Sequence, residues 1–142
     1  MSQVDLSPGN AIPAMLGFAD INNDIDVAPG LGCTTPAASC HGTTMPSGIM
    51  QLVAMAAGNM TELMANYNQV KMQCNLSNPT QSLFLLKPLA ISAGGVQHTG
   101  GNSYFMNTQN PMYQRWLYWI QLGAPFNEVS TMGDGGAGPG GG

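Results

Sequence analysis

The chain has 142 residues, of which 44% are apolar and only 7% are charged, and its formal net charge is −4. This length is enough for one domain with a hydrophobic core, and the apolar content excludes a disordered chain. Soluble proteins average roughly 25% charged residues, so uncharged amides and hydroxyls must provide most of the solvation here. The three cations, Lys71, Lys87 and Arg115, are too few and too scattered to bind a phosphate backbone or an anionic membrane surface. We therefore expect no nucleic-acid partner.

The sequence also indicates no segment that spans a membrane. It contains no apolar run of roughly 18 residues, the length that crossing a bilayer requires. Its first residues, MSQVDLSPGN, lack the positive start and apolar stretch of a signal peptide. Low charge with many amides favours a location outside the cytosol, so we expect a mature exported chain from which a signal has been removed.

Short helices separated by turns are expected in the first half of the chain. The apolar spacing around 14–23 predicts a short helix, and residues 33–48 are rich in Pro and Gly and read as turns. Residues 49–57 place their apolar side chains on one face at helical spacing, which predicts a helix broken at Gly58. Asn59 or Thr61 can then cap a second helix that runs to about residue 70.

The second half contains the clearest element. Residues 79–87 predict a short helix, with a buried strand as the alternative, and residues 90–110 read as a loop. Residues 111–122 predict a helix with Asn110 as its N-cap, proline at the first helical position and Gly123 just after its end. The chain closes on GDGGAGPGGG, which contains no core-forming side chain. We expect a single all-α domain over 1–126 and a flexible Gly-rich tail over 127–142.

Three cysteines, Cys33, Cys40 and Cys74, are present, and an odd number argues against a framework made only of disulfides. Six residues lie between Cys33 and Cys40, and His41 follows directly. Covalent haem attachment uses two thiols and an adjacent histidine, usually as C-x-x-C-H. The pair Cys40–His41 fits this pattern, and the small, turn-forming loop before it can bulge outward so that Cys33 reaches the second vinyl group.

Two other interpretations of the same cysteines stay open from the residues alone. Cys33, Cys40 and His41 can form a zinc or copper site with Cys74 or His98, although zinc sites favour about two to four residues between cysteines. A Cys33–Cys74 disulfide would instead give an adhesion or docking domain without redox chemistry.

Four stretches of the chain follow the motif order of one family. They are SCHG at Ser39–Gly42, PTQSLFLLK at Pro79–Lys87, HTGG at His98–Gly101 and YQRWLYWIQLGAP at Tyr113–Pro125. In this order the chain resembles the cytochrome c domains of planctomycete and myxobacterial surface proteins, and the resemblance covers roughly residues 20–126.

The resemblance implies a cytochrome c-like fold in which several short helices and long loops surround one haem c. It implies that Cys33 and Cys40 form the thioethers and that His41 is the proximal iron ligand. His98 occupies the place of the family's distal element, so bis-histidine ligation is expected. Two histidines close the iron to substrates and give a lower potential than His/Met ligation. The expected function is electron transfer and not enzymatic catalysis.

Several alternatives remain within this interpretation. Met45 and Met106 lie in predicted loops and are the rival distal ligands. A Cys33–Cys74 disulfide would leave Cys40 as the single thioether, and otherwise Cys74 is a buried thiol. Haem c is attached outside the cytoplasm, so we expect a periplasmic or cell-surface location and a redox partner protein. Assembly with copies of itself or with other haem proteins is left open.

Two further groups have structural and functional interpretations. Asp20, Asp24 and Asp26 form an acidic cluster whose spacing does not match a calcium loop, so we expect a solvated face. Trp116 and Trp119 share one stripe of the closing helix and are expected either to line the haem or to form ordinary core.

Overall fold

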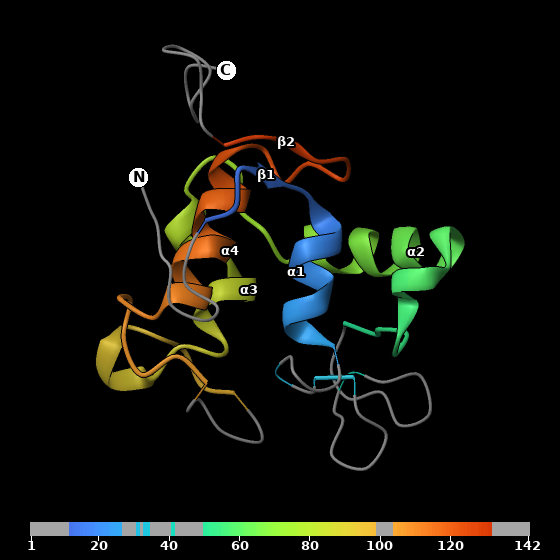
Figure 1. The fold of residues 1–142 in the computed structure, drawn as a ribbon. Coiled ribbons are helices and arrows are strands. Elements are labelled where there is room, and N and C mark those ends of the chain that lie inside the picture. The colour runs from blue at the N-terminus through green and yellow to red at the C-terminus, as the bar shows by residue number, and fades with distance from the viewer. Residues whose placement is uncertain are drawn as a thin grey trace. The chain divides into compact units, whose positions relative to one another are not determined.

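The computed structural model describes residues 12–26, 31, 33–34, 41, 50–98 and 104–131. The elements of this part of the chain are, in order, β1 (Met15–Leu16), α1 (Phe18–Ile25), α2 (Met60–Lys71), α3 (Leu83–Leu86), α4 (Pro111–Gln121) and β2 (Val129–Ser130), with single 3-10 turns at Ala56–Gly58, Pro79–Gln81 and Ile91–Ala93 (Figure 1). The expected helical character is found, together with one small sheet that the sequence did not indicate.

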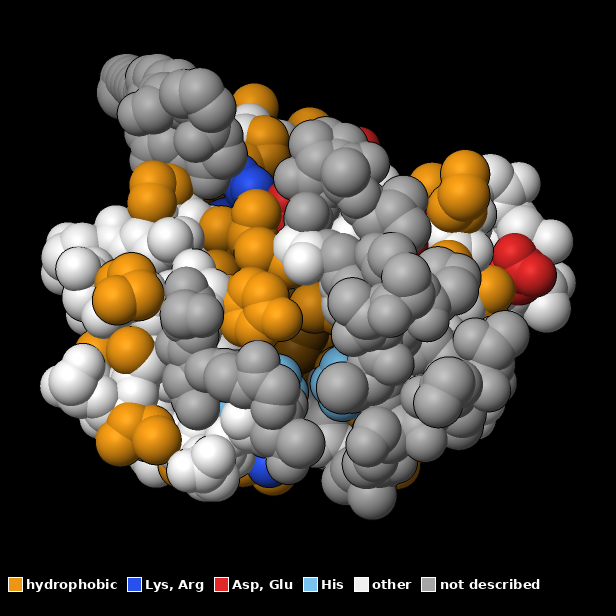
Figure 2. All heavy atoms as spheres, turned by 90° about the horizontal axis from the view of Figure 1, so that it is seen from below, with side chains coloured by type: hydrophobic (Ala, Val, Ile, Leu, Met, Phe, Trp, Pro, Cys, Tyr) orange, Lys and Arg blue, Asp and Glu red, His pale blue; other side chains and the backbone are white. Residues whose placement is uncertain are grey.

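The chain divides into two compact units. The first, Phe18–Gln73, carries His41 and is called the His41 unit. The second combines residues up to Gly17 with those from Cys74 onward, carries His98, and is called the His98 unit. No helix in the described part of the chain is long and apolar enough to cross a membrane. Figure 2 shows few charged side chains on the face that it draws, as the composition requires.

The core of the His41 unit is formed by α1 packing on α2. Phe18, Ile21 and Ile25 lie on one face of α1 at helical spacing and are all buried. On α2 the buried apolar positions are Leu63 and Val70. The predicted helix at 14–23 therefore exists, but it begins and ends later in the chain because its first residues form β1 instead.

Asn59 caps α2 as predicted, whereas the prediction of a helix before it is wrong. Asn59 is the N-cap of α2, and its Oδ1 accepts a hydrogen bond from the backbone N–H of Glu62 at 3.1 Å. The helix predicted at 49–57 is replaced, in its described part, by extended backbone over 50–53, a turn in which Met55 has a φ of 56°, and the 3-10 turn at Ala56–Gly58. Asn66 on α2 binds the backbone of Val53, and Asp26, directly after α1, accepts from the Met55 N–H. These bonds compete with helix formation.

The His98 unit contains α4, the element that the sequence predicted best. Asn110 Oδ1 accepts hydrogen bonds from the backbone N–H groups of Met112 and Tyr113, at 2.8 and 3.2 Å. Gly123 follows the helix with a φ of 99°, which suits glycine and strains other residues. The capping signals in the sequence therefore placed both ends of this helix to within a residue.

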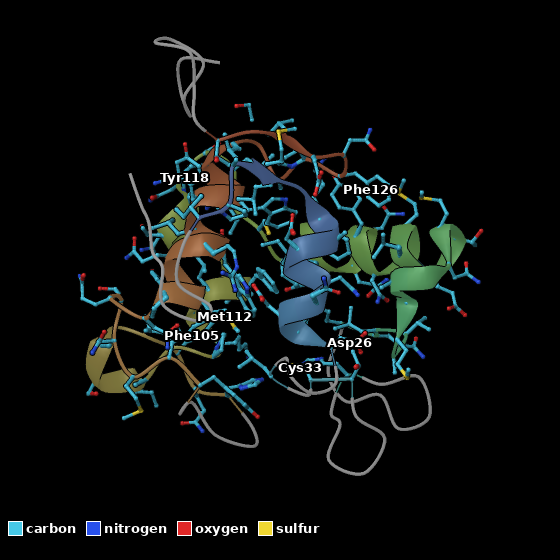
Figure 3. The ribbon with its side chains drawn as sticks, in the orientation of Figure 1. Asp26, Cys33, Phe105, Met112, Tyr118 and Phe126 are labelled. Atoms are coloured by element: carbon cyan, nitrogen blue, oxygen red, sulfur yellow. The ribbon has the colours of Figure 1, made fainter. Side chains whose placement is uncertain are left out.

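Aromatic rings form the core of the His98 unit. Trp116 stacks on Phe84 with ring centroids 4.3 Å apart, and Phe105 meets the Trp116 ring edge-on at 5.0 Å. Phe105 lies beside the first turn of α4, near Met112 (Figure 3). Both tryptophans are covered by protein side chains, so they are core residues of this unit. Burial also raises the pKa of Tyr113 above its usual value.

The predicted helix at 79–87 is present as a 3-10 turn at Pro79–Gln81 followed by α3, so the strand alternative is wrong. The loop expected at 90–110 includes a second turn at Ile91–Ala93. A parallel bridge joins Leu89 to Phe105 within this unit.

The sheet of the His98 unit pairs the two ends of its chain. β1 and β2 are antiparallel, with Met15 opposite Ser130. The hydroxyl of Tyr118, on α4, donates a hydrogen bond to the carbonyl of Thr131 at 3.0 Å. Residues 127–131, which the sequence assigned to the flexible tail, are thus bound into this unit. The rest of the predicted tail, 132–142, lies outside the described residues.

Candidate functional site

The C-terminal end of α1 holds the backbone of Cys33. The Cys33 N–H donates to the carbonyl of Ile25, in the last turn of α1, at 2.9 Å. The Thr34 hydroxyl donates to Asp26 Oδ1 at 2.5 Å, and Thr34 is 1% exposed. Figure 3 shows Asp26 and Cys33 together at this end of the helix. The first predicted thioether residue is therefore anchored through its own backbone and through its neighbour.

The acidic cluster is not the solvated face that the sequence suggested. Asp24 and Asp26 are only 8% and 7% exposed. Asp26 Oδ1 also accepts from the backbone N–H of Met55 at 3.0 Å, in addition to the Thr34 hydroxyl. Asp26 thus links the Cys33–Thr34 segment to the chain that follows His41. Its carboxylate is occupied in binding protein donors, which is the physical reason for its burial.

His41 is half-buried and held at two points by the extended segment over 50–53. Its Nδ1 lies 2.8 Å from the carbonyl oxygen of Met50, and its own carbonyl accepts from the backbone N–H of Leu52. A carbonyl oxygen only accepts, so Nδ1 carries the proton in this contact. In the neutral ring the lone pair is then on Nε2. Metal-ligating histidines commonly donate their other ring N–H to a backbone carbonyl in this way.

His98 is also half-buried, and it lies at the end of a stretch held by backbone bonds. The Val96 N–H donates to the carbonyl of Leu86, at the end of α3, at 3.1 Å. The Lys87 ammonium donates to the carbonyl of Gln97 at 3.4 Å. The residue before His98 is therefore tied to α3, although no regular element continues through the histidine itself.

Gly95 lies in the stretch that leads to His98. A Cβ on Gly95 would lie 1.8 Å from the carbonyl oxygen of Leu89, so Gly95 permits a close approach of two protein backbones. Gly94 instead has a φ of 104° and open space around it. Gly100 and Gly101 lie outside the described residues.

The remaining sulfur ligands are only partly visible. Cys40, the second predicted thioether residue, and Met45 lie outside the described residues. Cys33 and Cys74 are half-buried thiols. Met106, the other rival distal ligand, is 63% exposed.

Among the residues that the structure describes, no three His, Cys, Asp or Glu side chains lie close enough to hold a metal ion. A structural zinc site needs about four such ligands, whereas a haem iron needs one or two from the protein.

Two buried amides are functional candidates that the sequence interpretation missed. Asn22 and Asn66 are 1% and 0% exposed, on the inner faces of α1 and α2. Asn66 lies three residues after Leu63 and four before Val70, on the apolar stripe of its helix. An amide in the middle of such a stripe could have been recognised from the spacing alone as a buried polar residue that needs partners.

Comparisons with family models, with curated proteins and with solved structures found no match to this chain. The chemistry of the candidate site therefore rests on its own residues. The His41 unit provides an imidazole whose Nδ1 faces a carbonyl and a cysteine whose backbone is anchored, and the His98 unit provides its own histidine at the end of a tied loop.

Proposed function

We propose that the protein is a monohaem c-type cytochrome that transfers electrons. In this proposal Cys33 and Cys40 form the thioethers, His41 is the proximal ligand and His98 is the distal ligand of the same iron. The single observation that supports it most is the hydrogen bond from His41 Nδ1 to the Met50 carbonyl.

This hydrogen bond gives His41 two properties that an iron ligand needs. It fixes the tautomer, so the lone pair of the neutral ring is on Nε2, and it limits rotation of the ring. Donation of the Nδ1 N–H to a carbonyl is also the outer contact that metal-ligating histidines commonly make. Cys40 directly precedes His41 in the sequence, as the second cysteine precedes the histidine ligand in haem c attachment motifs.

The other residues hold the attachment segment and the second histidine in place. The hydrogen bonds at the end of α1 fix the backbone at Cys33, which limits the positions its thiol can reach. Gly95 and Lys87 tie the loop before His98 to α3. The haem, when bound, supplies one-electron chemistry between ferrous and ferric iron. The protein contributes two imidazoles and a surface with few charges.

The proposal includes a location and a partner. Haem c attachment places the protein in the periplasm or on the cell surface, and electron transfer requires a redox partner protein. The few charges, with a net value of −4, imply a contact with that partner that depends only weakly on salt.

Histidine variants of the full chain, expressed with a haem c maturation system, test the proposal. We expect the wild type to give a low-spin visible spectrum, and we expect His98→Ala to become high-spin because one axial ligand is removed. We expect His41→Ala to lose the low-spin spectrum as well. Met106→Ala is the matched control, because Met106 is an exposed rival ligand.

The outcomes separate the interpretations. A low-spin spectrum that is unchanged in His98→Ala but lost in Met106→Ala would identify methionine as the distal ligand. A colourless wild-type protein that contains stoichiometric zinc or copper would contradict the haem proposal and support the metal-binding module.

A further inference from the structure

The segment that holds His41 is an extended chain whose two edges have different partners. On one edge, the Met50 carbonyl and the Leu52 N–H bind His41. On the other edge, the N–H groups of Gln51 and Val53 donate to side chains of α2. This alternation is the one that extended backbone produces, because successive residues point their polar groups to opposite sides. The position of the His41 edge is therefore set by what binds the opposite edge.

Asn66 makes the central contact on that opposite edge. Its Oδ1 accepts from the Val53 N–H at 2.7 Å, and its Nδ2 donates to the Val53 carbonyl at 2.9 Å. One side-chain amide thus binds both polar groups of one backbone residue, as a neighbouring strand would. Asn66 is 0% exposed and is carried by a regular helix, so it is a rigid point of attachment. Val53 is next to Leu52 and three residues after Met50, the two residues that hold His41.

The orientation of both amides follows from these contacts. The Val53 N–H can only donate, so the atom facing it must be Asn66 Oδ1. The second N–H of Asn66 then donates to Asn22 Oδ1 at 2.9 Å. If the Asn22 amide were turned over, two N–H donors would face each other. Asn22 Nδ2 is consequently directed elsewhere, and it is buried with no hydrogen-bond partner among the described residues.

An orphaned donor of this kind lowers stability, so the pair is a poor choice for packing alone. An apolar side chain in place of Asn22 would remove this orphan, but one in place of Asn66 would leave the N–H and the carbonyl of Val53 without their partner. The Asn66 amide therefore provides two directional bonds to a backbone residue on the edge opposite the His41 contact.

We propose that Asn66, oriented by Asn22, is a positioning residue for His41: it fixes Val53 and through it the Met50 carbonyl that orients the imidazole. This inference rests on the proposed function, since it assigns Asn66 a role toward the proximal iron ligand. Asn66 itself is not an iron ligand and acts only through the extended segment.

The haem-loaded full chain and two variants test this role. Asn66→Ala removes both bonds to Val53, whereas Asn22→Ala leaves those bonds and removes only the group that orients Asn66. Asn68→Ala is the matched control, because Asn68 is an exposed asparagine on the same helix. Cyanide titration of the ferric protein reports how easily an axial imidazole is displaced. The paramagnetic resonance spectrum of the low-spin ferric form reports the orientation of the imidazole planes.

Loss of an outer-shell partner of a metal ligand typically weakens the metal bond roughly 10- to 100-fold. Because Asn66 is one contact further out, we expect Asn66→Ala to lower the half-saturating cyanide concentration roughly tenfold, at the weak end of that range. The resonance spectrum should change as well. We expect Asn22→Ala to change both readouts in the same direction by a smaller amount, and Asn68→Ala to change neither.

A purely structural role would give a different result. It would lower the melting temperature of Asn66→Ala while both iron readouts stayed at the values of the control, and that result would overturn the inference. If Asn66→Ala does not fold or load haem, Asn22→Ala decides: a shift supports the role of the pair and no shift overturns it. If the wild type itself binds no haem, the proposed function has failed. That outcome differs from failure of the inference, in which the wild type binds haem and the variants behave like the control.

Discussion

The two units of the protein are stabilised in different ways. The His98 unit is built on stacked and edge-on rings, such as Trp116 on Phe84 at 4.3 Å. In the His41 unit, Asp26 and Asn66 bind the backbone of the segment that holds His41. Apolar packing contributes stability without fixing direction, whereas hydrogen bonds are directional. In the His41 unit, directional side-chain bonds thus lie on the segment that contacts His41.

Composition accounts for part of this difference. Cys33 and Thr34 begin a stretch, 33–48, that is rich in Pro, Gly, Ser and Thr, and they are held by hydrogen bonds to Ile25 and Asp26. Buried backbone polar groups need partners of this kind. The residues around α4 include two Trp and two Tyr, whose large areas supply most of the packing that unit needs.

The largest effect is expected from removing a ring in the His98 unit. Trp116→Ala deletes a fully buried side chain that touches both Phe84 and Phe105, and we expect a loss of about 3–5 kcal/mol in unfolding free energy. Thermal unfolding followed by circular dichroism measures it. The control is Met106→Ala, at a 63% exposed position, where little change is expected. Equal melting temperatures for the two variants would show that ring packing does not stabilise this unit.

A smaller effect is expected at two glycines, one in each unit. A Cβ on Gly95 would lie 1.8 Å from the Leu89 carbonyl oxygen, so Gly95→Ala forces the backbone to move and should cost about 2 kcal/mol. A Cβ on Gly58 would meet nothing within 4 Å, so Gly58→Ala should be neutral or slightly stabilising. Urea unfolding of the pair measures the difference. A Gly95→Ala variant as stable as Gly58→Ala would contradict the tight contact that ties the His98 loop to α3.

The smallest effect should be the same in both units, because each contains a helix capped by asparagine. Asn110 caps α4 and Asn59 caps α2, and each side chain accepts from backbone N–H groups of the first turn. Substitution of either by alanine should cost about 1 kcal/mol. Denaturant midpoints provide the comparison. If one substitution cost several times more free energy than the other, the two units would differ at their helix caps as well as in their cores, which contradicts this prediction.

Local signals in the sequence predicted the elements that depend on local physics. Asn110, Pro111 and Gly123 placed α4, because caps act within one turn of the helix they terminate. The helix predicted at 49–57 was wrong for the converse reason. The apolar spacing there is helical, but Asn66 binds the extended backbone at Val53 and Asp26 binds Met55 where the chain turns, both from distant parts of the chain. A pattern within nine residues contains no information about those partners.

In the candidate site, too, some residues could be predicted from local sequence and others depend on distant partners. His41 and Cys33 could be selected from the sequence because the residues of a haem c attachment motif lie close together in a chain. The partners that position them could not, since Asp26 was interpreted as part of a solvated face and is buried by bonds to Thr34 and Met55. Asn22 is a second such partner, buried on α1 and bonded to Asn66. Their importance arises only when α1, α2 and the extended segment are brought together.

The central claim is that the cysteine cluster carries covalent haem. Its most direct test is a pyridine haemochrome spectrum with the intact mass of the full chain, expressed with a haem c maturation system. We expect one haem per chain, a mass equal to that of the polypeptide plus one haem, and the band position of a haem with two thioethers. The band position of a single thioether would remove Cys33 from the site and leave Cys40 and His41. A colourless protein of unmodified mass would contradict the claim itself.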